Sequence, residues 1–326
     1  MDYQKYLVTL ENRLTKVFSD STIKPDELYD PQRYIISLGG KRIRPLLSLI
    51  ASDLFCSDYT KAIPSAICVE LFHNFSLIHD DILDKAPLRR GNPTVHKKWN
   101  TNIAILSGDA MLVRAFIELN KSAQAHRDAL IQLFSKTAIE ICEGQQEDMN
   151  FELMESVTVD EYTTMITKKT AVLLACSLQM GAICAGADQS DAKRIYNCGK
   201  HLGIAFQLKD DVLDVFADQQ KFGKQVGGDI LANKKTYLLL KALELSNSKQ
   251  KKQIRNWLNA KKFNKKEKVQ ALIAIYNELN IREISESEIN KHFQAGLGEL
   301  KKIKKVDPAK KEKFKQFCFD LMQREK

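Results

Sequence analysis

The amino-acid sequence predicts an all-α protein, and three observations support this prediction. Apolar residues recur at intervals of three and four through most segments, which is the period of a helix with one buried face. Strict two-residue alternation, which would indicate strands, is almost absent. The chain of 326 residues contains 14 glycines and 7 prolines, about half their usual share. A fold built from many tight turns is therefore not expected.

The apolar pattern places helices along most of the chain. The expected helices cover residues 45–55, 63–84, 102–119, 129–151, 159–186, 192–216 and 236–246. Pro45 suits a first helical position, where the missing N–H costs nothing. Residues 221–236 are the most loop-like interior stretch, and the helical pattern continues beyond residue 246 in a more basic composition. We expect a single domain over residues 1–326, a bundle of antiparallel helices around a central cavity.

Composition indicates an ordinary globular protein, with 44% hydrophobic and 28% charged residues. No apolar run reaches the roughly 18 residues that a membrane-spanning helix needs, and the N-terminus lacks the basic-then-apolar pattern of a signal peptide. The seven cysteines form no CxxC pair, and most lie in apolar helical stretches. We interpret them as small buried hydrophobic residues in a reducing compartment, and we expect a cytoplasmic location.

The net charge of +9 comes largely from two late segments, residues 249–268 and 301–315. Two interpretations remain open. These lysines form the solvated faces of C-terminal helices, or they attract anionic ligands or an anionic membrane surface. No recognised nucleic-acid motif and no interleaving of aromatic and basic residues accompanies them, so a nucleic-acid partner is not expected.

Two carboxylate clusters lie about 130 residues apart, each inside an apolar helical stretch. Their members are Asp80, Asp81 and Asp84 in "DDILD", and Gln207, Asp210, Asp211 and Asp214 in "QLKDDVLD". Residues three or four apart share a helix face, and like charges there are mildly destabilising. One such cluster alone would be a solvated face, but two in apolar surroundings indicate a hard divalent cation. Mg²⁺ takes oxygen ligands and is usually completed by substrate phosphates.

Basic residues accompany both clusters and predict anionic ligands. They are Lys41, Arg42 and Arg44 in "GGKRIRP", the arginine pair in "LRRG" (88–91), and Lys169, Lys224 and Lys234 further along. The first group precedes a helix start, where backbone N–H groups and the helix dipole favour an anion. Arginine binds phosphate through two parallel hydrogen bonds. Each of these residues alone is typical of a surface, but together with the carboxylates they predict Mg²⁺ and two diphosphates.

In their order along the chain, these motifs resemble those of the trans-isoprenyl diphosphate (polyprenyl) synthases, over roughly residues 30–290. They are "GGKRIRP" (39–45), "DDILD" followed by "RRG", "GQQED" (144–148), "KT" (169–170), "FQLKDDVLD" (206–214) and "GKQVGGDILANKKT" (223–236). The resemblance implies an all-helical homodimer, a Mg²⁺-dependent prenyltransferase. Its substrates would be isopentenyl diphosphate and an allylic diphosphate, namely the dimethylallyl, geranyl or farnesyl compound.

The resemblance also implies a role for each matching residue. Three Mg²⁺ ions would bridge the allylic diphosphate to both motifs, with Asp80, Asp84 and Asp210 as direct ligands and Asp81, Asp211 and Asp214 in support. The allylic diphosphate would be held by Arg89, Lys169, Lys224 and Lys234, and isopentenyl diphosphate by Lys41, Arg44, His73 and Arg90. Thr170 and Gln207 would face the allylic cation, and the loop at 221–234 would close over the site. Without the resemblance, His73 would be interpreted as a core or interface histidine.

Residues preceding Asp80 by one turn or more would set the product length. Phe75 with the small Ser76, above Phe72, looks most like one class of geranylgeranyl (C20) synthases, with Phe75 as the floor of the channel. Two alternatives stay open: Phe75 as an ordinary core aromatic, and a farnesyl (C15) product. A non-catalytic subunit of a heteromeric synthase is a further alternative. Such subunits tend to lose aspartates or the "GGKR" stretch, and this chain keeps both.

Overall fold

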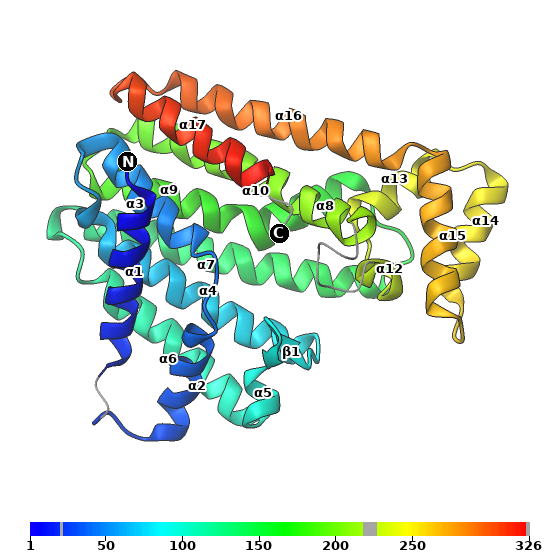
Figure 1. The fold of residues 1–326 in the computed structure, drawn as a ribbon, viewed down its shortest axis with the longest axis horizontal. Helices are drawn as coiled ribbons and strands as arrows, with labels where there is room; N and C mark the ends of the chain where they lie inside the picture. Colours follow the sequence, from blue (N-terminus) through cyan, green and yellow to red (C-terminus); the bar gives the residue numbers. More distant parts are fainter. Residues whose placement is uncertain (20–21, 218–226, 324–326) are drawn as a thin grey trace. The chain divides into compact units, whose positions relative to one another are not determined.

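The computed structural model describes residues 1–19, 22–217 and 227–323, and these are almost entirely helical (Figure 1). Within those residues the only strands are β1 (Leu88–Arg89) and β2 (Asn92–Pro93), which pair antiparallel. The all-α prediction is confirmed.

Contacts divide the chain into two compact units, each built from separate segments of the sequence. Unit 1 consists of Met1–Lys136, Cys176–Tyr196 and Lys304–Lys311, and unit 2 consists of Thr137–Ala175, Asn197–Ile303 and Glu312–Lys326. Both units draw on early and late parts of the chain. The expectation of a single domain over residues 1–326 remains a prediction.

Unit 1 holds the N-terminal helices and the short hairpin. Its elements are α1 (Tyr3–Phe18), α2 (Asp26–Ser37), α3 (Ile43–Cys56), η1 (Tyr59–Ala62), α4 (Ile63–Leu83), β1, β2, α5 (Val95–Lys98), α6 (Thr101–Leu119), the start of α7 (Gln124–Leu153), most of α9 (Val172–Cys184) and the start of α10 (Gln189–Phe216). Helices α4 and α6 pack along most of their length. Residues 65–72 of α4 are all buried, whereas its last two turns, which carry the first aspartates, are largely half-buried.

Unit 2 holds the rest of α7 and α10 and nearly all of the C-terminal helices. Its further elements are α8 (Val159–Ile166), η2 (Thr167–Ala171), α12 (Gly228–Leu231), α13 (Tyr237–Leu245), α14 (Ser248–Asn259), α15 (Lys265–Glu278), α16 (Ile281–Lys302) and most of α17 (Pro308–Gln323). Polar side chains cap the N-termini of several of these helices. In the capping boxes Thr158–Glu161 and Asn247–Gln250, each member accepts the backbone N–H of the other.

Two expected helices differ from the observed ones. The stretch at 159–186 is not one helix, because the π-helical turn η2 separates α8 from α9. The first expected helix begins at Ile43 and not at Pro45, which lies in its third position. Arg42 adopts a left-handed conformation, with φ of 48°, and this turn starts the helix two residues early.

Helix α9 approaches α3 closely because Gly181 has no side chain. A Cβ at Gly181 would lie 2.1 Å from the carbonyl oxygen of Ser48. The Ser48 hydroxyl donates a hydrogen bond of 2.9 Å to the carbonyl of Ser177 across the same contact. This glycine therefore sets the distance between two helices that are more than 120 residues apart in sequence.

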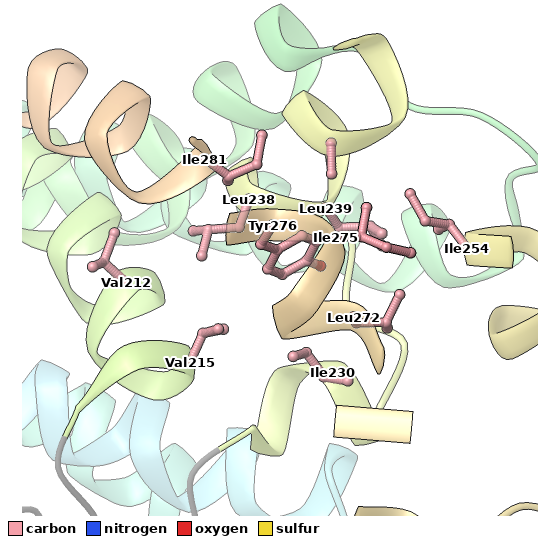
Figure 2. Close-up of a cluster of buried hydrophobic side chains, with 11 residues drawn as sticks. Val212, Val215, Ile230, Leu238, Leu239, Ile254, Leu272, Ile275, Tyr276 and Ile281 are labelled. Carbon is pink, nitrogen blue, oxygen red and sulfur yellow. The ribbon is translucent and has the colours of Figure 1, made fainter. Parts of the chain in front are cut away.

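The main apolar core of unit 2 surrounds Tyr276, whose ring is fully buried (Figure 2). It is built from α10, α12, α13, α14, α15 and the first turn of α16. The cluster comprises Val212, Val215, Ile230, Leu238, Leu239, Ala242, Ile254, Leu272, Ile275, Tyr276 and Ile281. Because Val212 lies between the aspartates of "DDVLD" and Val215 directly follows them, this core fixes the helix that carries the second carboxylate cluster.

The structure also bears on the cysteines and on membrane spans. All seven cysteines are free thiols, and five of them are buried, whereas Cys142 is exposed and Cys56 is partly exposed. Their interpretation as buried hydrophobic residues therefore holds for five. None of the helices within the described residues is both long and apolar enough to cross a membrane.

Candidate active site

The first carboxylate cluster lies at the C-terminal end of α4, in unit 1. Asp80 and Asp81 occupy the last turn, and Asp84 is the C-cap, with its N–H bonded to the carbonyl of Asp80 at 2.8 Å. Asp84 is exposed and Asp80 half-buried, whereas Asp81 is only 2% exposed. The two carboxylates accessible to an ion are therefore those expected as direct ligands.

Asp81 is held by Arg89 of the hairpin that follows α4. The guanidinium donates two hydrogen bonds of 2.8 Å, from Nε and Nη2, to the two carboxylate oxygens. This arrangement supports the expected auxiliary role for Asp81. Arg89, which is expected to hold the allylic diphosphate, therefore already forms an ion pair with a buried carboxylate.

A tight turn aims the second arginine of "LRRG" in another direction. Arg90 and Gly91 form the two-residue loop between β1 and β2, with φ of 52° and 77°, as a type I′ turn requires. Arg90 donates a hydrogen bond to the carbonyl of Gly39, and its guanidinium lies over Gly40, where a Cβ would be 2.8 Å from Nη2. Gly40, the second glycine of "GGKR", therefore makes room for Arg90.

Arg44 and His73 meet beside this arginine. Arg44, in the first turn of α3, and His73, in the middle of α4, are joined by a contact of 3.2 Å between Nη1 and Nε2. Burial lowers the pKa of His73 well below its usual range, and the charges of Arg44 and Arg90 lower it further. His73 is therefore neutral and accepts the arginine hydrogen at Nε2. Lys41 lies exposed just before α3. The structure thus gathers Arg44, His73 and Arg90 in one place.

Arg42, one of the basic groups of "GGKRIRP", is committed to the fold. Its guanidinium is buried, and it donates to Glu70 at 2.6 Å, to Glu11 at 2.8 Å and to the carbonyl of Ile36 at 2.8 Å. These contacts tie α1, α2 and α4 to the start of α3. Arg42 is therefore a structural residue and not an anion ligand.

The second carboxylate cluster lies in the last two turns of α10, in unit 2. Asp210 is exposed, Asp214 is half-buried and Asp211 is 3% exposed. The Tyr162 hydroxyl and the Gln207 amide each donate a hydrogen bond to the Asp211 carboxylate. As in the first cluster, the expected direct ligand is accessible, and a neighbouring aspartate is held by the protein.

The Thr170 hydroxyl belongs to the same network. Its Oγ1 donates a hydrogen bond of 3.0 Å to Oε1 of Gln207, whose Nε2 donates one of 3.1 Å to Asp211. Because the hydroxyl hydrogen is used, the Thr170 oxygen presents only lone pairs to its surroundings. That orientation suits a residue facing a positive charge.

Asp229 is a fourth carboxylate at the second cluster, and the sequence analysis did not single it out. Its backbone N–H donates to Asp214 at 2.9 Å. Burial raises the pKa of Asp229 to about 6, and the charge of Asp214 raises it further. Burial likewise raises the pKa of Asp211 to about 7. In the sequence Asp229 appears only as the last residue of "GGD". It lies beside "DDVLD" because the chain folds back to α10, which the sequence alone does not show.

The π-helical turn η2 places Lys169 and Thr170, and two glycines admit it. A Cβ at Gly144 of α7 would lie 2.4 Å from the backbone N of Lys169, and one at Gly203 of α10 would lie 2.5 Å from Cα of Ala171. Lys169 pairs with Asp148 of "GQQED" at 2.6 Å. Single π-turns inside helices are frequent at functional sites, and this one directs Thr170 to Gln207 of the second cluster and the two lysines before it to carboxylates of α7.

The remaining basic residues belong to the segment after the second cluster. Lys234 is exposed, its N–H bonds to the carbonyl of Asp229 at 3.0 Å, and its charge lowers the pKa of that carboxyl group. Lys224 lies outside the described residues, as does the first part of the expected closing loop, residues 221–226. Lys235 is occupied elsewhere, because it donates to the carbonyls of Phe151 and Met154 at the end of α7.

The expected chain-length residues belong to an aromatic cluster in unit 1. Phe75 is half-buried, and its ring centroid lies 5.5 Å from that of Phe72 and 4.7 Å from that of His79. Phe72 is fully buried and packs at 5.3 Å against Phe134 of α7. Ser76 is half-buried and donates to the carbonyl of His73 at 2.9 Å. Phe75 therefore lies above a closed aromatic layer.

The donor atoms of both clusters suit Mg²⁺, which prefers carboxylate oxygen and water. Burial first, and neighbouring carboxylates second, raise the pKa values of Asp211 and Asp229, and a bound divalent ion would favour their charged forms. Within the described ranges no three His, Cys, Asp or Glu side chains come close enough to hold an ion by themselves. Mg²⁺ commonly completes its coordination with water and substrate phosphates.

Comparison with known proteins identifies the family. Residues 25–276 match the model of the family described as polyprenyl synthetase. The chain belongs to the polyprenyl synthetase family. The predicted prenyltransferase activity is therefore confirmed at the level of enzyme class.

Relatives and solved structures agree with this assignment. Over 223 residues the chain is 43% identical to a geranylgeranyl diphosphate synthase of Methanosarcina mazei, covering 68% of this chain and 69% of the relative. It is 39% identical to a short chain isoprenyl diphosphate synthase of Methanocaldococcus jannaschii, over 76% of both chains. A crystal structure of a geranylgeranyl pyrophosphate synthase superimposes with a TM-score of 0.94, at 40% identity and 99% coverage of both chains.

Proposed function

We propose that this family member is a geranylgeranyl diphosphate synthase. It extends dimethylallyl, geranyl and farnesyl diphosphate with isopentenyl diphosphate and stops at the C20 product. The observation that carries the proposal is that both carboxylate clusters are intact and each has basic residues beside it. Similar relatives named for the C20 product support the choice of chain length.

Three Mg²⁺ ions would be held at the two clusters, with Asp80, Asp84 and Asp210 as direct ligands. Asp81, Asp211 and Asp214 would support them from positions where the protein already orients each carboxylate. When bound, Mg²⁺ would supply electrostatic stabilisation of the diphosphate charge. The hydrogen bonds to Asp81 and Asp211 would hold these two carboxylates in fixed positions before the ions bind.

The protein's own groups then assist departure of the allylic diphosphate. As the carbon–oxygen bond breaks, its electron pair goes to the diphosphate oxygen, and cationic groups stabilise the growing negative charge. Lys169 would provide one such charge, since Asp148 holds its ammonium in a fixed position. Arg89, Lys224 and Lys234 would provide others.

The second half of the reaction forms the new carbon–carbon bond. The double bond of isopentenyl diphosphate attacks the allylic cation, and the departing diphosphate takes up the proton that is lost. The Thr170 and Gln207 oxygens would stabilise the cation without reacting with it. Exclusion of water is essential, since water would quench the cation.

Isopentenyl diphosphate would bind at Arg44, His73 and Arg90, with Lys41 at the edge. Because His73 is neutral, its ring accepts a hydrogen bond from Arg44 and adds no positive charge to those of Arg44 and Arg90. Gly40 leaves space for the Arg90 guanidinium, which would otherwise meet a Cβ at 2.8 Å. This set would bind its diphosphate without a metal ion.

A homodimer is part of the proposal, and an apolar face on α6 supports it. Leu106, Val113 and Ile117 lie on one face of the helix, and more than half of each side chain is exposed. Their spacing of seven and four matches a helix stripe that packs against another helix. A second copy of this chain would cover it. Val113→Glu with Ile117→Glu should give a monomer in sedimentation velocity experiments.

One experiment tests the function directly. The purified protein is incubated with isopentenyl diphosphate, Mg²⁺ and each allylic starter, and product length is measured by mass spectrometry. Accumulation of C20 is expected. Arrest at C15 would mean that other helices close the channel earlier, and no condensation with any starter would favour the non-catalytic subunit.

The Phe75→Ala variant tests the position of the channel floor. Removing the half-buried ring above Phe72 should allow elongation beyond C20, because the next closed layer lies deeper. The Ser76→Ala variant changes little volume and serves as the control. Unchanged product length from the Phe75 variant would contradict the role assigned to this ring.

A further inference from the structure

The more basic of the two late segments forms one helical hairpin. Helices α14 and α15 run side by side in unit 2, and the turn joining them lies at the end away from α16 (Figure 1). Residues 249–268 contain nine basic residues and one acidic residue, a net charge of +8, whereas the whole chain carries +9. The proposed chemistry uses none of these nine residues.

The basic residues on α14 lack the ion pairs that other helices make. Elsewhere in unit 2 lysines are paired within their own helix at 2.9 to 3.1 Å, as in α13, α16 and α17. On α14 the basic residues are Lys249, Lys251, Lys252 and Arg255. None of these four forms an ion pair with another described residue. Lys251 and Arg255, four positions apart, repel each other at a cost of about 0.2–0.5 kcal/mol.

The turn between the helices and the first two residues of α15 continue this surface. Lys261, Lys262, Lys265 and Lys266 are exposed and form no ion pair within the described chain. Phe263 lies among them and is half-buried. We call these eight unpaired residues of α14, the turn and the start of α15, together with Phe263, the basic hairpin surface.

The ninth basic residue shows what a structural lysine looks like in the same hairpin. Lys268 is buried, donates to Oδ1 of Asn233, and lies 4.4 Å from the centroid of the Phe263 ring. It fixes the turn from inside. The contacts of Lys268 explain its role in the fold. The side chains of the eight basic residues in the basic hairpin surface make no comparable contact with any described residue.

We infer that the basic hairpin surface binds an anionic lipid bilayer. Clustered basic residues bind anionic membranes, each contributing about a five-fold gain in partitioning, and an aromatic side chain at the tip adds a second, apolar signal. The choice of a membrane over another polyanion rests on the proposed function, since a C20 prenyl diphosphate is an amphiphile that partitions into lipid.

Vesicle co-sedimentation tests this inference without using catalysis. The full-length protein is mixed with vesicles of phosphatidylcholine alone or with one third phosphatidylglycerol, at low and high salt. Binding should require the anionic lipid. It should also disappear near 1 M salt, where screening acts over about 3 Å.

Matched variants locate the surface. Lys261→Gln, Lys262→Gln, Lys265→Gln and Lys266→Gln together should weaken binding on the order of several hundred-fold, from about five-fold for each residue. The control removes four charges from the other basic segment, with Lys301→Gln, Lys302→Gln, Lys304→Gln and Lys305→Gln. That control should retain most of the binding, and circular dichroism checks that both variants are folded.

Three outcomes would overturn the inference. They are no difference between neutral and anionic vesicles, equal loss of binding in both variants, and binding to single-stranded RNA in place of vesicles. Turnover is measured separately with soluble substrates. An active enzyme that ignores vesicles refutes only the membrane inference, whereas a vesicle-binding protein without turnover refutes only the proposed function.

Discussion

The close approach of Gly144 to the π-turn makes Gly144→Ala an informative perturbation. The new Cβ would lie 2.4 Å from the backbone N of Lys169 and 2.8 Å from its Cα. Ordinary contact begins near 3.4 Å, so α7 and η2 must separate by about 1 Å. Overpacking of this kind costs about 1–3 kcal/mol of folding free energy.

The larger effect should fall on activity. Lys169 and Thr170 would move with η2, and a misplacement of about 1 Å costs on the order of 100-fold in rate. We expect kcat/KM with geranyl diphosphate to fall by about that factor. The assay measures incorporation of labelled isopentenyl diphosphate, well below the melting temperature of the variant.

Gly298→Ala is the matched control, since a Cβ there meets nothing within 4 Å. It lies inside α16, where alanine should stabilise the helix by up to about 1 kcal/mol and leave kcat/KM unchanged. Wild-type kcat/KM in a folded Gly144→Ala enzyme would refute the argument that this glycine positions η2.

Three further predictions concern the buried arginine, the histidine pair and the metal. Arg42→Ala should lower the free energy of unfolding, measured in urea, by about 3–5 kcal/mol, because it leaves Glu70 buried without its partner. His201 and His292 lie 3.1 Å apart between Nδ1 atoms, and burial lowers the pKa of both. The unfolded chain therefore binds protons first as the pH falls below about 6.5, so stability should decrease there. A His201→Gln/His292→Gln double variant should reduce that slope in urea titrations at pH 7 and pH 5. Chelation with EDTA should abolish turnover, and added Mg²⁺ should restore it.

Each of these predictions has its own control. Arg13→Ala, an exposed change on α1, should alter stability by no more than about 0.5 kcal/mol, and an equal loss would contradict the role given to Arg42. An unchanged pH slope in the double variant would assign acid sensitivity to other histidines. Full turnover after chelation would rule out a metal requirement.

Much of the helical layout follows from local sequence pattern. The expected helix at 102–119 corresponds to α6 (Thr101–Leu119), and that at 192–216 to α10 (Gln189–Phe216). These segments carry an apolar face with helical spacing and no internal break, so local preference and burial agree. The carboxylate clusters were found for a similar reason, because their spacing is meaningful within one helix.

Features that depend on distant partners were not predicted. The interruption of the expected helix at 159–186 arises where Gly144 and Gly203 admit a π-turn from two other helices. Nothing within the stretch itself signals this break. The structural role of Arg42 likewise requires Glu11 and Glu70, which lie on separate helices.

The sequence by itself determined the helical class, the two carboxylate motifs and the family, because each is encoded in residue types at short spacing. Only the tertiary structure decided which charged groups serve chemistry and which serve the fold. Asp81 and Arg42 carry the same charges as their neighbours, but burial forces each to take a protein partner. A charge that is removed from water must be paired, and the partner is known only once the chain has folded.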